Sequence, residues 1–242
     1  MAKKKFNRYK ITVRGRKLQV IVDKVLFFRE LQRLHGRFWG VTAVLGMIIG
    51  MGICFAIRPE LWNVSSAFSD FGKDVRTAPF FAGSMFFAAY GLWRWRNYLS
   101  RTLKRPGPVI LLITLTIVGL YLVALMPVSW HPWPYRVHIF GVILAGISMV
   151  LTVVIDGLLT NTRRTSHLLL SRIIRMVSVL LITIGGVLTY GSASAVGWYS
   201  VALLGESLIL FGYSLWVYMK TIQGEGARSR ISTLIQKIIV IE

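Results

Sequence analysis

The feature that most constrains the fold is a series of long apolar runs that are nearly free of charge. Several of them are eighteen or more residues long, in a chain of 242 residues of which 55% are hydrophobic. A helix needs about 20 apolar residues to cross a bilayer, and these runs are too long and too uniform for the strands of a membrane barrel. Because a helix satisfies its backbone hydrogen bonds internally, the pattern predicts an all-α, polytopic integral membrane protein. We expect six transmembrane helices at 38–57, 79–98, 108–127, 138–158, 174–192 and 197–219.

Lysine and arginine are distributed unevenly among the connections between these runs. The formal net charge is +20. Basic residues are abundant in 1–37, after the second run, between the fourth and fifth runs, and after the last. They are scarcer or balanced by acidic residues in 58–78, 128–137 and 193–196. Since cytoplasmic loops carry the excess of Lys and Arg, we expect both termini to be cytoplasmic, in a multi-pass protein of the cell membrane, plasma or inner.

The chain divides into a basic cytoplasmic arm (1–37), a six-helix bundle (38–219) and a basic tail (220–242). In the arm, apolar residues alternate around Gly15, which predicts a short hairpin. From 22 to 34 they recur at helical spacing against basic residues, which predicts an amphipathic helix on the membrane surface. A solvated arm that only fixes the topology explains the same charges.

The positive charge points to membrane lipids as partners. So high a charge raises the question of nucleic acid, but the basic residues gather in the arm and at the ends of the apolar runs. Anionic headgroups on the cytoplasmic side are therefore the expected partner, and nucleic acid is not. We expect a headgroup rim that includes Lys10, Lys24, Arg29, Arg33, Arg94 and Arg96. No cofactor or metal is expected, and the single cysteine excludes a cysteine-based metal cluster.

Two acidic residues within the apolar runs are candidates for function, because burying an unpaired charge is costly. Counting from Trp198 places Glu206 roughly 12 Å below the outer surface, near mid-membrane. It either fixes helix packing through hydrogen bonds or serves a substrate, an ion or a headgroup. Asp156, near the cytoplasmic end of the fourth run, precedes Arg163 and Arg164 by a few residues and is expected to form an interfacial ion pair.

The outer connections add Asp70 and Asp74 from 62–83, and His131 and His138 at the start of the fourth run. Together these side chains could hold a metal at the outer face. Their spacing matches no metal-binding motif, and hydrogen bonds from the histidines to neighbouring loops explain them better.

Local chemistry favours structural roles for several residues of these connections. Pro132 and Pro134 predict a turn between the two histidines. Ser69 or Asp70 is expected to cap a short loop helix, with Gly72 permitting the bend.

Two short motifs on the outer side resemble those of a known family. The first comprises Asn63, Ser65, Ser69, Asp70 and Gly72, followed by Pro79, and the second comprises Met126 and Pro127, followed by His138. With six spans and both ends inside, the chain resembles the domain-of-unknown-function 998 family. It also resembles the broader group of six-span proteins related to FGF-receptor-activating protein, DRAM and Sfk proteins.

The resemblance covers the first four runs and the hydropathy plan, and the basic arm lies outside it. From eukaryotic relatives it implies a link to lipid remodelling of GPI anchors, phospholipid asymmetry or autophagy. It carries over no catalytic residue. The positions that match the motifs in this sequence are Asp70, Pro79 and His138.

Two functions are compatible with these patterns. The first is a non-enzymatic, lipid-interacting or accessory membrane protein whose outer loops cover a pocket between helices. The second is a membrane-embedded enzyme or transporter for a lipid or small solute, with Asp70, His131, His138 and Glu206 lining a cavity open to the outer face. The lack of a recognised catalytic set favours the first. A subunit of a larger membrane complex is a third alternative.

Overall fold

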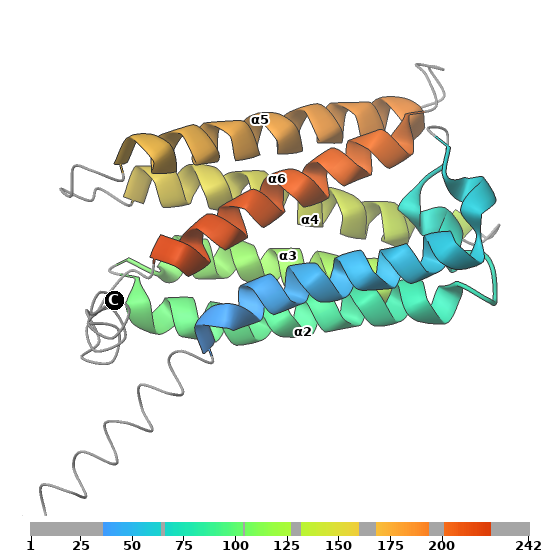
Figure 1. The fold of residues 1–242 in the computed structure, drawn as a ribbon, viewed down its shortest axis with the longest axis horizontal. Helices are drawn as coiled ribbons and strands as arrows, with labels where there is room; N and C mark the ends of the chain where they lie inside the picture. Colours follow the sequence, from blue (N-terminus) through green and yellow to red (C-terminus); the bar gives the residue numbers. More distant parts are fainter. Residues whose placement is uncertain are drawn as a thin grey trace, which may run out of the picture. The chain divides into compact units, whose positions relative to one another are not determined.

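The computed structural model describes residues 36–63, 66–103, 105–126, 132–159, 168–193 and 201–223. In these ranges the regular elements are all helices (Figure 1). The first long helix, Gly36–Ile57, is followed by two short 3-10 helices, η1 (Pro59–Leu61) and η2 (Phe68–Gly72). The remaining helices are α2 (Ala78–Thr102), α3 (Gly107–Leu125), α4 (Pro132–Leu159), α5 (Leu168–Ala193) and α6 (Ala202–Gln223).

Five of the long helices are long and apolar enough to cross a membrane, namely Gly36–Ile57, α3, α4, α5 and α6. They confirm the prediction of an all-α, multi-pass membrane protein for the described part of the chain. α2 has 25 residues, but its arginines, which include Arg94, Arg96 and Arg101, lower its mean hydropathy.

Two helices begin six residues earlier than the predicted spans. α4 begins at Pro132 rather than 138, and α5 at Leu168 rather than 174. The predicted turn at Pro132 and Pro134 is therefore wrong. Both prolines lie in the first turn of α4, where a backbone N–H would have no partner within the helix, so their missing N–H groups cost nothing.

Consecutive helices pack against one another, from α2 to α6, and α4 also contacts α6. Glycines stand where the backbones approach most closely. A Cβ on Gly119 of α3 would lie 2.6 Å from the carbonyl oxygen of Gly141 on α4. One on Gly185 of α5 would lie 2.4 Å from the carbonyl oxygen of Gly205 on α6. Small residues allow such close packing between membrane helices.

The first helix packs along α2 and contacts α6 in its N-terminal part. A Cβ on Gly40 would lie 2.9 Å from side-chain atoms of both Trp95 on α2 and Val217 on α6. Farther along, Gly50 faces Ser84 of α2, while α6 turns toward α5. The first helix and α6 therefore diverge toward the end of the bundle that carries η2, as Figure 1 shows. We call this the η2 end.

Several predictions concern residues outside the described ranges. These are the hairpin and amphipathic helix of the arm, the tail beyond residue 223, and the side chains of Lys10, Lys24, Arg29, Arg33 and His131.

Candidate functional site

The connection between the first helix and α2 folds onto the end of the bundle through η2. Phe68 and Phe71 are buried, and the ring of Phe55 contacts both, with centroid separations of 6.2 and 4.8 Å. Thr77 Oγ1 donates a hydrogen bond of 2.6 Å to the carbonyl oxygen of Phe71. The alternation of aromatic and polar residues in this stretch thus lets η2 bury two rings in the bundle.

The carboxylate of Asp70 is engaged within this connection. Its Oδ2 accepts the backbone N–H of Ala67 at 2.8 Å, and its Oδ1 lies 2.6 Å from Lys73 Nζ. This confirms the predicted capping role of Asp70 at a loop helix. The first backbone N–H groups of a helix have no partner within it, so the bond satisfies a group that would otherwise lack one.

Asp74 is held by two arginines of the same connection. It accepts hydrogen bonds from the backbone N–H of Arg76 at 2.8 Å and from Arg76 Nη2 at 2.9 Å, and it lies 3.2 Å from Arg58 Nη1. These bonds, first the one from the Arg76 side chain, lower the pKa of Asp74 from 3.8 to about 2. The Arg58 side chain likewise donates to Glu60 and lowers the pKa of that carboxyl.

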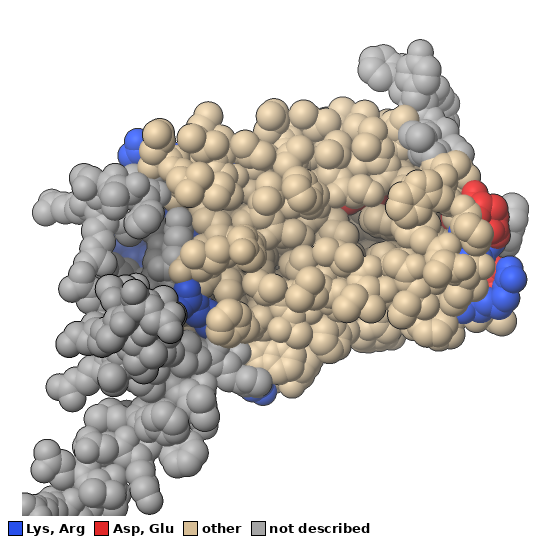
Figure 2. Space-filling view, in the orientation of Figure 1, with Lys and Arg blue, Asp and Glu red and all other residues tan. Residues whose placement is uncertain are grey.

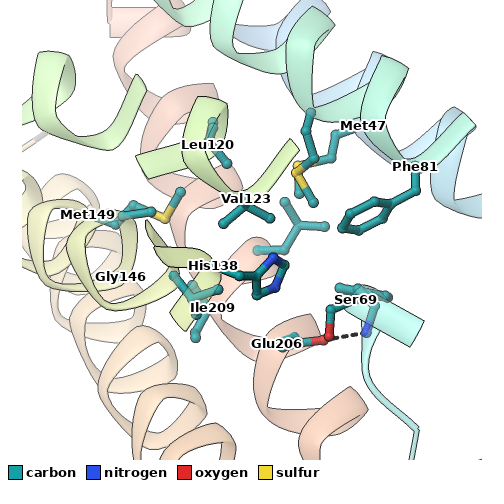
Figure 3. A pocket seen from close by; sticks show the side chains of 15 residues that line it. Met47, Ser69, Phe81, Leu120, Val123, His138, Gly146, Met149, Glu206 and Ile209 are labelled. Carbon is teal, nitrogen blue, oxygen red and sulfur yellow. Dashed lines mark hydrogen bonds between the residues drawn. The ribbon is translucent and has the colours of Figure 1, made fainter. Parts of the chain in front are cut away.

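A cavity of about 90 Å³ lies beneath η2, between the first helix, α2, α3, α4 and α6. Its wall is apolar except for Ser69, His138 and Glu206 (Figure 3). Three of its apolar residues are methionines from three different helices: Met47, Met85 and Met149. The space exceeds what one water needs, and methionine side chains adapt to ligands of varied shape.

The cavity is polar at one end and apolar along the rest of its length. His138 lines it near the start of α4, and Met149 lines it about 16 Å farther along that helix. Figure 2 shows the surface hollowed on the side of the bundle, near the η2 end, in the region where α6 and the first helix diverge. The cavity is therefore amphipathic and is reached from the side of the bundle.

Glu206 stands at the polar end of this cavity. Its Oε2 accepts the backbone N–H of Phe68 at 2.5 Å, so that η2 is bonded directly to α6 (Figure 3). Glu206 lies about 6 Å along α6, which begins at Ala202. It is therefore nearer the η2 end than the predicted mid-membrane position, because α6 begins later than residue 197. In the described part of the chain, no Lys or Arg forms a salt bridge with it.

His138 is buried, at 2% exposure, and links α4 to the end of α3. Its Nδ1 lies 2.8 Å from the carbonyl oxygen of Met126. Because a carbonyl oxygen only accepts hydrogen bonds, Nδ1 carries the proton. The bond is of the kind predicted for an interfacial histidine, but the ring also faces the cavity alongside Glu206 (Figure 3).

Of the predicted outer-face residues, His138 and Glu206 share the cavity, whereas Asp70 and Asp74 are absent from its wall. Within the described ranges, no three His, Cys, Asp or Glu side chains are grouped as a metal site requires. Sequence reasoning did not predict that the backbone N–H of Phe68 would donate a hydrogen bond to Glu206. The aromatic pair around Ser69 and Asp70 was the available signal that this stretch enters the bundle.

A second carboxylate is buried at the opposite end of the bundle. Asp156 is 1% exposed and lies 2.7 Å from Lys220 Nζ and 3.2 Å from Arg175 Nε. It also accepts a hydrogen bond of 3.1 Å from Trp216 Nε1. The predicted ion pair is present, and its described partners come from α5 and α6 rather than from the nearby sequence.

Basic side chains gather at this end, which we call the basic end. Arg94 lies 5.5 Å from the ring centroid of Trp39, and Arg96 donates to Thr114 Oγ1 at 3.1 Å. The two described arginines of the predicted headgroup rim, Arg94 and Arg96, thus lie at this end with their guanidinium groups against neighbouring helices. The Lys and Arg residues of the described helices and turns here are Arg37, Arg94, Arg96, Arg101, Arg105, Arg172, Arg175 and Lys220.

Comparison of the chain with protein-family models, curated proteins and solved structures finds no match.

Proposed function

We propose that this protein is a non-enzymatic, lipid-interacting membrane protein that takes the apolar chain of a lipid into the cavity beneath η2. The observation that carries the proposal is the cavity itself, apolar along its length and polar only at the η2 end. A lipid has the same division between chain and polar end, and ligand pockets are typically apolar with a few placed polar groups. The hollow on the side of the bundle provides entry from the bilayer.

The proposed topology has six spans with both termini in the cytoplasm of a cell whose plasma or inner membrane holds the protein. The length of α2 and its packing against the first helix and α3 support it as the sixth span. The basic end would face the cytoplasm and its anionic headgroups. The η2 end, where Lys and Arg are balanced by Glu60, Asp70 and Asp74, would face outward.

Membership in the domain-of-unknown-function 998 group, or among its six-span relatives, is part of this proposal. Asp70 belongs to η2, Pro79 to the first turn of α2, and His138 to the beginning of α4. All three matching positions belong to the η2 end, which supports a shared site there.

The contacts of His138 and Glu206, the two titratable residues of the cavity wall, favour binding over catalysis. Acid–base chemistry needs a side chain within hydrogen-bond reach of the proton it moves. The described hydrogen bonds of His138 and Glu206 instead go to backbone groups of Met126 and Phe68. Those bonds suit residues that shape the polar end of a binding site.

Filling the cavity tests the proposal. Gly146 lines the cavity, and a Cβ there would meet no atom within 4 Å, so Gly146→Leu occupies the space without a backbone clash. Gly186 on α5 has equally open surroundings and does not line the cavity, which makes Gly186→Leu the matched control. The readout is labelling by a phospholipid with a diazirine in its acyl chain, in nanodiscs, with peptide mapping by mass spectrometry.

We expect labelled peptides from the cavity-lining parts of α4 and α6 in the wild-type protein and in Gly186→Leu. Gly146→Leu should lose this labelling about tenfold, while labels on lipid-facing surfaces stay unchanged. Equal labelling of α4 and α6 in all three proteins would refute the proposal.

A further inference from the structure

Apart from the Ser69 hydroxyl, which can both donate and accept, the polar side chains at this end of the proposed lipid site present hydrogen-bond acceptors. One oxygen of Glu206 accepts from Phe68, and the described contacts give the other oxygen no hydrogen bond or ion pair. His138 donates its Nδ1 proton to Met126, so in the neutral ring Nε2 is an acceptor. A complementary ligand therefore supplies donors at this point.

The charged side chains of the connection between the first helix and α2 do not turn the polar end of the cavity into a site for anions. Lys73 is paired with Asp70, and both Arg58 and Arg76 are paired with Asp74. Their positive charges are thus directed to carboxylates outside the cavity wall. A ligand with an anionic end would meet the lone pairs of Glu206, and like-charge contacts in a poorly solvated site are unfavourable.

Asp156, the other carboxylate inside this bundle, shows which groups bind such a carboxylate when they belong to the protein itself. Asp156 has the ammonium group of Lys220 at 2.7 Å, together with an N–H donor of a tryptophan. Glu206 has the corresponding N–H donor from Phe68 but no ammonium group among the described residues. An ammonium group from a ligand would give Glu206 the same two kinds of donor, an ammonium group and an N–H, that Asp156 has.

We propose that the cavity recognises an amphiphile with a primary ammonium group, which bonds to Glu206 while the attached chain lies along α4 toward Met149. This inference rests on the proposed lipid-binding function and specifies its ligand. Two sources share this chemistry: a phospholipid with an ethanolamine headgroup and a single-chain amine. Both carry an ammonium group with N–H donors and an apolar chain, which match Glu206 and the methionine-lined wall. In the single-chain amine the two are adjacent, whereas in the phospholipid a phosphate and the glycerol lie between them.

The test uses three single-chain probes that differ only at the polar end. Each carries a diazirine in the same alkyl chain, and the ends are a primary amine, a hydroxyl and a carboxylate. The full-length protein is held in nanodiscs of choline phospholipid, whose headgroup has no N–H donor. The measured quantity is the labelling of α4 and α6 peptides in the wild-type protein, in Glu206→Gln and in Gly146→Leu.

Glu206→Gln is a suitable variant because the amide oxygen of glutamine still accepts the Phe68 N–H while the negative charge is lost. In the wild-type protein we expect the amine to label about tenfold more than the alcohol, and the carboxylate to label least. Glu206→Gln should reduce amine labelling to the level of the alcohol. Gly146→Leu should reduce labelling by both.

The outcomes separate failure of this inference from failure of the proposed function. If amine and alcohol label the wild-type protein equally, and both depend on Gly146, the ammonium preference is wrong and the lipid cavity stands. If no probe depends on Gly146, the proposed function fails. Persistence of the amine preference in Glu206→Gln also overturns the role of Glu206.

Competition identifies the source of the ammonium group. Replacing choline phospholipid by ethanolamine phospholipid should suppress amine labelling if the natural ligand is a bilayer phospholipid. Unchanged amine labelling in ethanolamine nanodiscs supports a single-chain amine instead.

Discussion

Two carboxylates lie within this helix bundle, and their surroundings differ. Asp156 at the basic end is surrounded by an ammonium group, a guanidinium group and an indole N–H from α5 and α6. Glu206 at the η2 end has one backbone N–H and an apolar cavity beside it. The first arrangement satisfies a buried charge within the protein, and the second leaves room for a group from outside.

The difference assigns different tasks to the two ends. At the basic end, Asp156 joins three helices through side chains that are almost fully buried, so that its interactions stabilise the bundle. At the η2 end, Glu206 joins α6 to the Phe68 backbone of a short 3-10 helix. Replacing the single hydrogen bond between Glu206 and Phe68 by a bond to a ligand costs much less free energy than breaking a buried network of charges.

The largest expected effect comes from Asp156→Ala. It leaves the Lys220 ammonium group and Arg175 without their shared carboxylate in a buried site, which should cost about 3–5 kcal/mol of unfolding free energy. Glu206→Ala removes one hydrogen bond and should cost about 1–3 kcal/mol. Unfolding of both variants in detergent micelles, followed by circular dichroism, measures the two losses.

A double variant checks the cause of the larger loss. Lys220→Met combined with Asp156→Ala removes two of the opposite charges together and should recover part of the stability lost in Asp156→Ala alone. Equal losses for Asp156→Ala and Glu206→Ala would contradict the comparison between the two ends.

Sequence reasoning found both carboxylates but not the groups that surround them. The apolar runs predicted the helices because hydropathy is a property of each segment, and Glu206 and Asp156 stood out as charges within those runs. Their partners come from other segments: Phe68 lies 138 positions from Glu206 in sequence, and Lys220 is on a different helix from Asp156. Such contacts depend on how the helices pack, which no single-segment pattern encodes.

The predictions that differed from the structure have local physical causes. The prolines at the start of α4 can break a helix or begin one, and the outcome depends on whether a helical turn precedes them, because only then do the missing N–H and the clash with the carbonyl four residues earlier disrupt the helix. The arginines of α2 lower its hydropathy, but Arg96 bonds to Thr114 on the adjacent α3 and Arg94 stacks on Trp39. These side chains are accommodated by neighbouring helices, which composition alone does not reveal.

A change at the α5–α6 contact should have an intermediate effect and sharpen the comparison at the η2 end. A Cβ on Gly185 would lie 2.4 Å from the carbonyl oxygen of Gly205, the residue before Glu206. Gly185→Ala should therefore force α6 away from α5 and cost about 1–3 kcal/mol. The adjacent Gly186 has open surroundings, so Gly186→Ala should be neutral or slightly stabilising.

Both glycine variants are measured by thermal unfolding and by labelling with the amine probe. Because the displaced helix carries Glu206, Gly185→Ala should also reduce amine labelling, whereas Gly186→Ala should leave it unchanged. A loss of stability in Gly185→Ala with full labelling would mean that the α5–α6 contact does not position Glu206.

The smallest expected effect concerns Asp74, whose charge is balanced outside the membrane-spanning helices. Its hydrogen bonds from Arg76 lower its pKa from 3.8 to about 2 in the folded protein. A carboxyl with a lowered pKa contributes stability above its ordinary pKa and loses that contribution as the pH falls through the folded value.

Asp74→Asn should therefore lower the thermal midpoint slightly at neutral pH, and the difference from the wild type should shrink between about pH 4 and pH 2. Arg76 is largely exposed, with 64% of its side chain accessible, so solvent screening keeps the effect small. A difference in thermal midpoint that stays constant down to pH 2 would show that Asp74 stabilises the connection by packing and backbone contacts. The negative charge of its carboxylate, which distinguishes the η2 end from the basic end, would then contribute nothing to stability.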